Sequence, residues 1–277
     1  IFSVILFSGF LYALPLMREL DLKSLDWFMQ GHFPSPDIAL IAIDNKSIAE
    51  IGRWPWDRSV HARLINVLSE YTPRAAGYDV IFSDLSEEAE DYLLAYSFNS
   101  IDFPVILAGE LIFLKGPDRD IKELVPLKIF TDSEKVRVGY VNIEPSYGGI
   151  ARMIPEKKVF QKKEITPFAY MLKESVNPPG SFSFRGRHLV NFAGPAGTFP
   201  TYSASDVILK KIHPKLLKDK IVLIGATASN LHDVLMVPLE NPVMSGIEWH
   251  ANVLDNILTD RALYFVPEFI PKLIGLF

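Results

Sequence analysis

The sequence predicts an α/β fold: a three-layer sandwich on a mostly parallel mixed sheet, with an antiparallel hairpin extension and flanking transmembrane segments. Three observations predict it. Apolar runs of strand length alternate with segments of helical periodicity. Two strand-like runs surround a Gly-Gly turn in the middle of the chain, and the first 17 residues carry no charge. Because 49% of the 277 residues are hydrophobic, the chain can bury a sizeable core.

The two ends of the chain are apolar. About 20 apolar residues cross a bilayer, so residues 1–17, IFSVILFSGFLYALPLM, are expected to form the C-terminal part of a transmembrane helix. A secretory signal peptide is the alternative, although the small residues of a cleavage site are missing. Residues 263–277 are expected to start a second transmembrane segment, with Glu268 and Lys272 at the interface. Residues 20–262 then form an extracytoplasmic domain of a cell-membrane protein.

The first half of this domain predicts a repeated strand–helix pattern. Residues 37–44, 75–84 and 103–111 are near-continuous apolar runs, typical of strands that are covered on both faces. A helix from residue 58 to 71 and an acidic-start helix over 86–98 connect them. We expect the three strands to be parallel and their connections right-handed.

The second half predicts a hairpin and then a return to strand–helix alternation. Residues 136–145 and 150–160 flank the turn Ser-Tyr-Gly-Gly and indicate an antiparallel extension. The last helix begins with a capping box made by Ser245 and Glu248. The remaining expected elements are a helix at 165–175, a strand at 188–195, a helix at 203–210, a strand at 220–227 and the last helix at 245–258.

The stretch RWPWDR begins the first long helix. Pro55 disfavours helical geometry at Trp54, and Asp57 can accept hydrogen bonds from the first free amides, so the helix should begin near Arg58. Trp54 and Trp56 are interpreted mainly as packing that covers this helix start. Contact with a ligand is the alternative for both tryptophans.

Asp79 lies inside an apolar strand, GYDVIF, and a buried carboxylate needs a partner. Arg58 is the partner that we expect, because a fork-shaped guanidinium suits a buried carboxylate. In this interpretation the pair is structural, and ligand binding by the pair is the alternative.

Polar residues that end the predicted strands are the candidates for ligand binding, because open α/β sheets bind ligands at the carboxyl ends of their strands. They are Asp44, Asp84, Thr227 and Asp233. Local capping is the main alternative for Asp44 and Asp84, and a bound ion or polyhydroxylated ligand is the other. His232 beside Asp233 lacks a second histidine at ligand spacing, so we expect no metal site and no cofactor.

Composition excludes several classes of protein. A formal net charge of −5 with dispersed Lys and Arg residues argues against nucleic-acid binding. The absence of cysteine excludes disulfides and thiolate metal sites. The sequence contains neither a G-x-S-x-G elbow nor an H-E-x-x-H motif, so we expect no catalytic residues.

Seven segments resemble the second family of CHASE domains: IAIDNKSIAEIGRWPWDRSVHARLINVL, GYDVIFSD, VGYVNIEP, GIARMIP, HLVNFAGP, KIVLIGATASNLHDVLMVP and GIEWHANVLDNIL. The resemblance covers residues 20–262, and W-P-W-x-R at residues 54–58 is its most specific part. It implies an extracytoplasmic sensor of a membrane receptor whose cytoplasmic output is an adenylate or guanylate cyclase, a histidine kinase or a Ser/Thr kinase. Relatives place an acidic residue beside the hairpin glycine, whereas this chain has Tyr147 before Gly148 and retains Arg152.

The sequence therefore predicts a membrane-tethered sensor without catalytic activity. Its signal would be a small molecule, an ion or a protein, and the receptor is expected to be a homodimer by analogy with tethered receptors. A structural or protein-interaction ectodomain that controls dimerisation is the second hypothesis, and a periplasmic enzyme is the third.

Overall fold

The computed structural model describes residues 31–114, 121–177, 187–228, 231 and 234–264. Its centre is a seven-stranded sheet in the order β4-β3-β2-β10-β1-β9, with β5 also paired to β3. All pairings in this sheet are parallel except that of β4 with β3. The strands are β1 (Ile38–Ile43), β2 (Ala75–Asp79), β3 (Val105–Phe113), β4 (Ile121–Leu124), β5 (Val136–Tyr140), β9 (Thr201–Ser203) and β10 (Ile221–Ala226).

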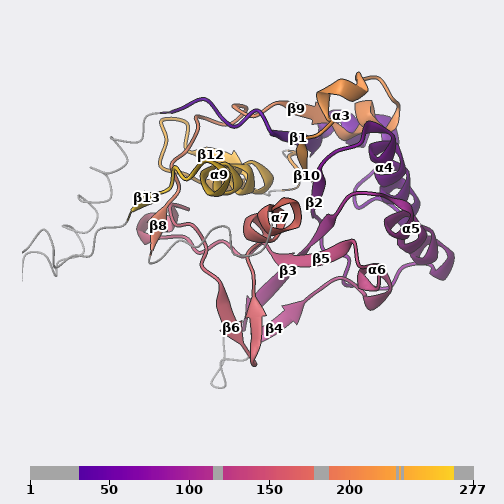
Figure 1. Cartoon of the computed structure of the whole chain (residues 1–277), viewed down its shortest axis with the longest axis horizontal. Coiled ribbons are helices and arrows are strands. Elements are labelled where there is room, and N and C mark those ends of the chain that lie inside the picture. The colour runs from indigo at the N-terminus through magenta and orange to yellow at the C-terminus, as the bar shows by residue number, and fades with distance from the viewer. Residues whose placement is uncertain (1–30, 115–120, 178–186, 229–230, 232–233, 265–277) are drawn as a thin grey trace, which may run out of the picture.

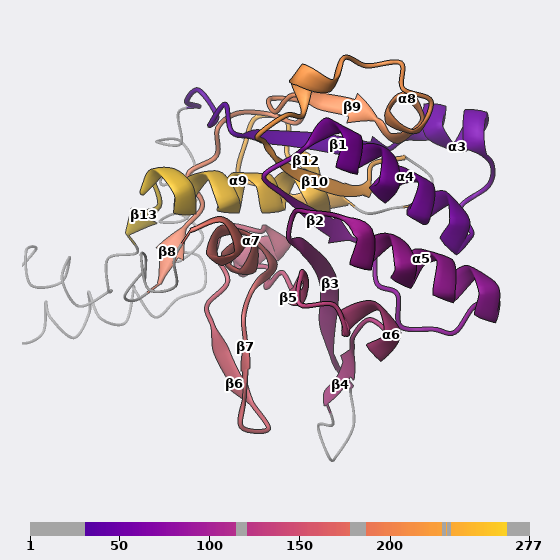
Figure 2. The same ribbon diagram turned by 45° about the vertical axis from the view of Figure 1, so that its right-hand side comes forward.

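Helices cover both faces of the sheet (Figure 1, Figure 2). The expected three-layer α/β arrangement is therefore confirmed. The first face carries α3 (Asn45–Ile51), α4 (Arg58–Tyr71), α5 (Glu88–Ser100), α6 (Lys128–Thr131) and α8 (Ala204–Ile208), and the second carries α7 (Phe168–Val176) and α9 (Gly246–Thr259).

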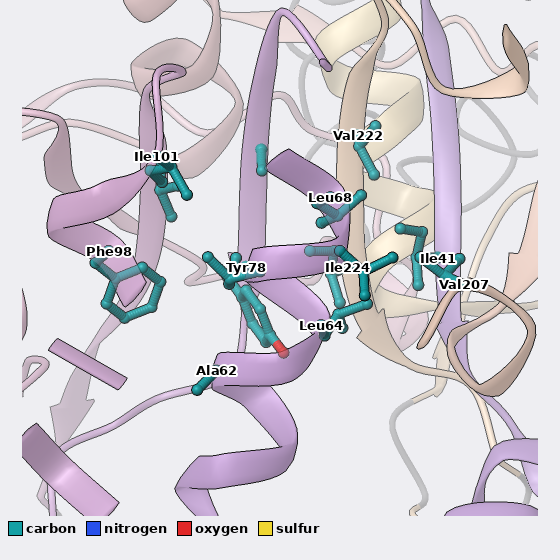
Figure 3. Packing of buried hydrophobic residues seen from close by; sticks show 14 of the residues in the cluster. Ile41, Ala62, Leu64, Leu68, Tyr78, Phe98, Ile101, Val207, Val222 and Ile224 are labelled. Carbon is teal, nitrogen blue, oxygen red and sulfur yellow. The ribbon is translucent and has the colours of Figure 1, made fainter. Parts of the chain in front are cut away.

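The two cores arise from the alternation of side chains along the strands. In β1, Ile41 and Ile43 point into the core beneath α4 and α5, whereas Ile38 and Leu40 point into the core beneath α7 and α9. Figure 3 shows Ile41 in the first core with Leu64 of α4 and neighbouring side chains of the sheet. Strands covered on both faces must be apolar throughout, which explains the continuous apolar runs of the sequence.

The parallel strands predicted in the first half, β1, β2 and β3, were placed correctly, whereas β9 was not predicted and the neighbours of β1 and β2 differ from those expected. β10 lies between β1 and β2 and pairs with both in parallel register. Helix α3, which the sequence pattern did not indicate, follows β1 directly. Its seven residues are too few to give a clear helical periodicity.

The predicted hairpin over residues 136–160 is wrong. The first run forms β5, a parallel strand beside β3. The Ser-Tyr-Gly-Gly segment does turn the chain, with Gly148 and Gly149 at φ values of 77° and 75°. However, the chain returns toward Met236 and Leu189, to which Ile150 and Met153 are bridged, and not toward β5.

Two antiparallel extensions exist elsewhere. β4 continues the sheet beside β3, and a separate hairpin joins β6 (Lys158–Phe160) to β7 (Lys163–Ile165). Two further pairs are β11 (Val234–Met236) with β12 (Val243–Ser245), and β8 (His188–Leu189) with β13 (Leu263–Tyr264). The run expected at 188–195 therefore contributes a two-residue strand outside the main sheet.

Among the described residues, no helix has the length and apolar character needed to span a membrane. The transmembrane segment predicted for residues 1–17 lies outside the described residues. Of the segment predicted for 263–277, only Leu263 and Tyr264 are described, and they form β13.

Candidate functional site

The carboxyl ends of the parallel strands meet at one edge of the sheet. The chain leaves β1 and β2 toward the layer of α4 and α5, but it leaves β10 toward α9 on the other face. Neighbouring strands whose connections depart to opposite faces frame the crevice where such sheets usually bind ligands. Here the loop after β10 folds over β1, because the amides of Thr227 and Ala228 both donate to the carbonyl of Ile43 at 3.1 Å. Thr227 thus helps to close this edge.

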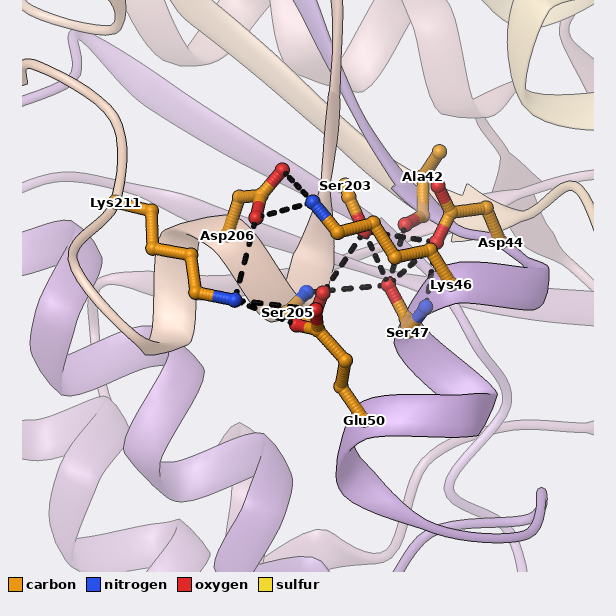
Figure 4. A network of polar contacts seen from close by, with 9 residues as sticks. All are labelled: Ala42, Asp44, Lys46, Ser47, Glu50, Ser203, Ser205, Asp206 and Lys211. Atoms are coloured by element: carbon orange, nitrogen blue, oxygen red, sulfur yellow. Dashed lines mark hydrogen bonds and ion pairs between the residues drawn. The ribbon is translucent and has the colours of Figure 1, made fainter.

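Asp44 ends β1 and is the N-cap of α3 (Figure 4). Its carboxylate accepts hydrogen bonds from the amide of Ser47 at 2.8 Å and from the hydroxyl of Ser47 at 2.6 Å. The hydroxyl of Ser203, at the end of β9, donates to the same oxygen at 2.8 Å. Asp44 therefore caps α3, in agreement with the local-capping interpretation.

Two exposed ion pairs connect α3 to the region of α8. Lys46 lies 2.6 Å from Asp206, and Lys211 lies 2.9 Å from Glu50. The hydrogen bond to Asp206 raises the pKa of Lys46, and the hydrogen bond from Lys211 lowers the pKa of Glu50. Figure 4 shows that these pairs surround the buried serines, so their charges are neutralised within the cluster.

The tryptophans of the WPWxR motif pack above β2. Trp56 is 6% exposed, and its indole nitrogen donates to the carbonyl of Gly52 at 2.9 Å. Trp54, half-buried, lies edge-on to Trp56 with ring centroids 5.4 Å apart. Both rings contact His61, whose Nδ1 lies 2.7 Å from the hydroxyl of Tyr78. This geometry agrees with the packing interpretation of the tryptophans.

His61 is uncharged in the folded domain. Burial, and then the nearby positive charge of Arg58, lower the pKa of His61 to about 3. The aromatic cluster therefore keeps a neutral imidazole at its centre.

Asp57 precedes α4 as expected, but its side chain makes no capping hydrogen bond. The amide of Ser59 in the first turn donates instead to a carboxylate oxygen of Glu90 in α5, at 2.5 Å. A carboxylate from the neighbouring helix therefore caps α4. The exposed Pro55 follows Trp54 through a cis peptide bond.

Arg58 pairs with a different carboxylate from the one expected. Its Nε donates to Asp91 of α5 at 3.2 Å, its Nη2 donates to the backbone carbonyl of Asp84 at 2.8 Å, and its guanidinium lies 4.8 Å from the ring centroid of Phe82. Asp79 instead ends β2, in register with Gly225 of β10. The expectation failed because α4 packs along α5, which places the first turn of α4 against the start of α5.

An open surface cavity of about 500 Å³, several of whose lining side chains are exposed, lies beside this ion pair, where the chain passes from β2 into α5. Asp91 belongs to both features: one carboxylate oxygen accepts from Arg58, and the other accepts from the amide of Ser86 at 3.0 Å. The side chain of Asp84 is exposed at the same connection. The cavity is lined by Leu85, Ser86, Glu88, Asp91, Tyr92, Leu127, Lys128 and Ile129.

A family model described as the CHASE2 domain matches residues 2–276. The chain belongs to the CHASE2 domain family. CHASE2 domains are extracellular sensory domains of signalling proteins, so the role of this domain is sensory and not catalytic. No curated protein and no solved structure matches the chain.

The second face of this CHASE2 domain depends on a polar stripe along α9. Glu248, Asn252 and Asn256 are buried, four residues apart, on one side of the helix. Asn256 accepts from the amide of Asn191 and donates to its carbonyl, both at 2.7 Å. Asn252 accepts from the amide of Ala193 at 2.9 Å. These asparagine side chains form hydrogen bonds with backbone groups of Asn191 and Ala193 that would otherwise pair with a neighbouring strand. Residues 188–195 therefore need no place in the main sheet.

The capping box predicted at the start of α9 is wrong, although the N-cap position is correct. Ser245 is the N-cap, but its side chain makes no capping hydrogen bond. Glu248 turns away and accepts from the amides of Gly197 at 2.8 Å and Thr198 at 3.1 Å. Burial raises the pKa of Glu248, and the hydrogen bonds from the loop amides lower it in part. The i, i+4, i+8 polar spacing on an apolar helix was the signal that could have indicated this role.

Asp255 joins the two ends of the described domain. It is fully buried, and its carboxylate lies 2.8 Å from Nε2 of His32 and accepts from the amide of Ser35 at 2.6 Å. Arg261 adds a hydrogen bond to the carbonyl of Phe33 at 3.2 Å. The segment that enters the domain is therefore fixed to the helix that leaves it.

Arg152 is 2% exposed and donates to the hydroxyl of Ser146 at 3.0 Å, within the turn that replaced the expected hairpin. Asp233 lies outside the described residues. Within the described ranges, no group of three or more His, Asp or Glu side chains could hold a metal ion.

Proposed function

We propose that this CHASE2 domain is the ligand-sensing, extracytoplasmic part, over residues 20–262, of a membrane-bound receptor. The receptor's output would be an adenylate or guanylate cyclase, or a histidine or Ser/Thr kinase. The observation that carries the proposal is the cavity next to the Arg58–Asp91 pair. A ligand in this cavity would contact Asp91, whose carboxylate binds Arg58 of the WPWxR motif.

The chemistry of the cavity favours a small amphipathic molecule. Leu127 and Ile129 offer apolar surface, while Glu88 and Lys128 offer one charge of each sign. A polar group that competes for Asp91 would weaken its bond to Arg58, and α4 and α5 would then shift relative to each other. Ligand binding in the cavity would thereby change the position of α4, and through α4 the packing of the rest of the domain.

The second candidate, a protein-interaction ectodomain that controls homodimerisation, is favoured by one surface. The outer side of α5 exposes Tyr92 at 58%, Leu93 at 43% and Tyr96 at 70%. Large apolar side chains gathered on one helix face favour contact with a protein partner.

A substitution that fills the cavity tests whether the cavity is the ligand-sensing site. The full chain is screened with small metabolites by thermal shift, since a molecule that binds only the folded state raises its stability. Molecules that stabilise the parent should lose their effect on Ile129→Trp and keep it on Val159→Trp, an exposed position outside the cavity lining. If no molecule stabilises the parent, or if the effect survives Ile129→Trp, the cavity is not the sensing site.

A further inference from the structure

The entry and exit of the domain carry exposed aromatic side chains. Phe33 is 93% exposed, and Tyr264 is 74% exposed with its ring 4.7 Å, centroid to centroid, from the ring of His188. Leu263 beside it is 37% exposed. Isolated exposed apolar residues are common on proteins, but these three lie where the described chain begins and ends.

The contacts around Asp255 hold this surface together as one end of the molecule. His32 and Ser35 bind the Asp255 carboxylate, and Arg261 binds the carbonyl of Phe33. Figure 1 shows the start of the described chain and β13 at the same end, beside the C-terminal part of α9. Phe33 and Tyr264 therefore face outward from a single, hydrogen-bonded end.

The sequence leads from this end to a mostly apolar run on each side. FVPEFIPKLIGLF, whose charged residues are Glu268 and Lys272, follows Tyr264 directly. On the other side, the charged stretch of residues 18–32 separates Phe33 from the uncharged run of residues 1–17. Aromatic side chains that border apolar segments gather at the headgroup level of membranes, and arginine is attracted to anionic headgroups. Tyr264 and Arg261 match that combination, and the hydrogen bond from Arg261 holds Phe33 beside them.

We propose that this end, through Phe33, Leu263 and Tyr264, rests in the headgroup layer of the membrane. The proposal depends on the proposed function, since it requires a membrane-bound receptor. Docking would fix the domain's orientation relative to the membrane, so that a movement of α9 would be passed to the membrane segments.

The test uses the absence of native cysteine. Cysteines that replace Phe33 and Tyr264 one at a time are labelled with an environment-sensitive fluorophore. A cysteine at Val159, 77% exposed on the β6–β7 hairpin, is the control. Each labelled full chain is incorporated into vesicles of phosphatidylcholine and phosphatidylglycerol. Quenching by aqueous iodide is then compared with quenching by nitroxide lipids.

We expect labels at 33 and 264 to be quenched by the lipids and protected from iodide, and the label at 159 to show the reverse. Tyr264→Ser should raise iodide quenching at 33 several-fold. If the chain floats with the vesicles but all three labels are equally open to iodide, docking is disproved and the receptor function stands. If the chain does not float with them, the receptor function itself is disproved.

Discussion

Arg58 shows how a single side chain connects the family motif to the rest of the molecule. It leaves the WPWxR turn, binds the Asp91 carboxylate and covers the ring of Phe82. The side chains of Arg58 and Asp91 are 14% and 6% exposed, so solvent screens the pair weakly. Removing one member leaves the other buried and unpaired, which is more costly than losing an exposed pair.

Arg58→Ala should therefore lower the free energy of unfolding by about 3–5 kcal/mol, and adding Asp91→Asn should restore part of the loss. Urea unfolding of the purified chain measures both effects. The control is Lys210→Ala, because Lys210 and Glu70 are each more than half exposed and such pairs contribute about 1 kcal/mol or less. Equal midpoints for Arg58→Ala and Lys210→Ala would contradict the bracing role.

At the scale of the element, α9 organises the second face through side chains and not through sheet pairing. Its buried polar stripe holds the backbone from Asn191 to Thr198, while the opposite side of the helix packs on the sheet. Buried amides are satisfied by these side chains, and each group left without a partner costs about 1–3 kcal/mol.

Asn256→Ala should release the amide and carbonyl of Asn191 and lower the free energy of unfolding by about 2–4 kcal/mol. Hydrogen exchange at the amide of Asn191 should accelerate at the same time, because this amide donates to the side chain that the substitution removes. Asn99→Ala is the matched control, since Asn99 bonds only to Ala95 of its own helix. Unchanged exchange at Asn191 in Asn256→Ala would show that the stripe does not hold the segment.

The same elements show what a sequence can predict. Strands β1, β2, β3 and β10 and helices α4, α5 and α9 follow from local apolar patterns, which their burial on both faces or on one face produces. The partner of Arg58 and the path after Gly149 depend on which distant segments meet. Local pattern does not contain that information, because Asp79 and Asp91 are equally plausible carboxylates until α5 is placed.

At the scale of the whole molecule, acidity should weaken the fold through its buried histidines. Burial lowers the pKa of both His61 and His250 to about 3, whereas an unfolded histidine titrates near 6.5. Below pH 6.5 the unfolded chain therefore binds more protons than the folded one. The stability contributed by the neutral histidines is present above pH 6.5 and is lost as the pH falls toward 3.

Between pH 7 and pH 5 each histidine should remove about 2 kcal/mol from the free energy of unfolding. Glu248, whose raised pKa acts in the opposite direction, reduces the net change. Urea unfolding across this range measures how steeply the free energy of unfolding depends on pH. His250→Gln should reduce this dependence by the contribution of one histidine. If the slope of His250→Gln equals that of the parent, His250 does not titrate on unfolding.

The central position of β10 has a consequence for biogenesis. β10 separates β1 from β2, yet β2 ends at residue 79 and β10 begins only at residue 221. Both neighbours of β10 are therefore synthesised long before it. Pairings between segments so distant along the chain form slowly. Because β10 pairs with both β1 and β2, the centre of the sheet cannot close until residue 226 has been synthesised. We therefore expect β1 and β2 to remain without their central partner during most of the synthesis of the domain.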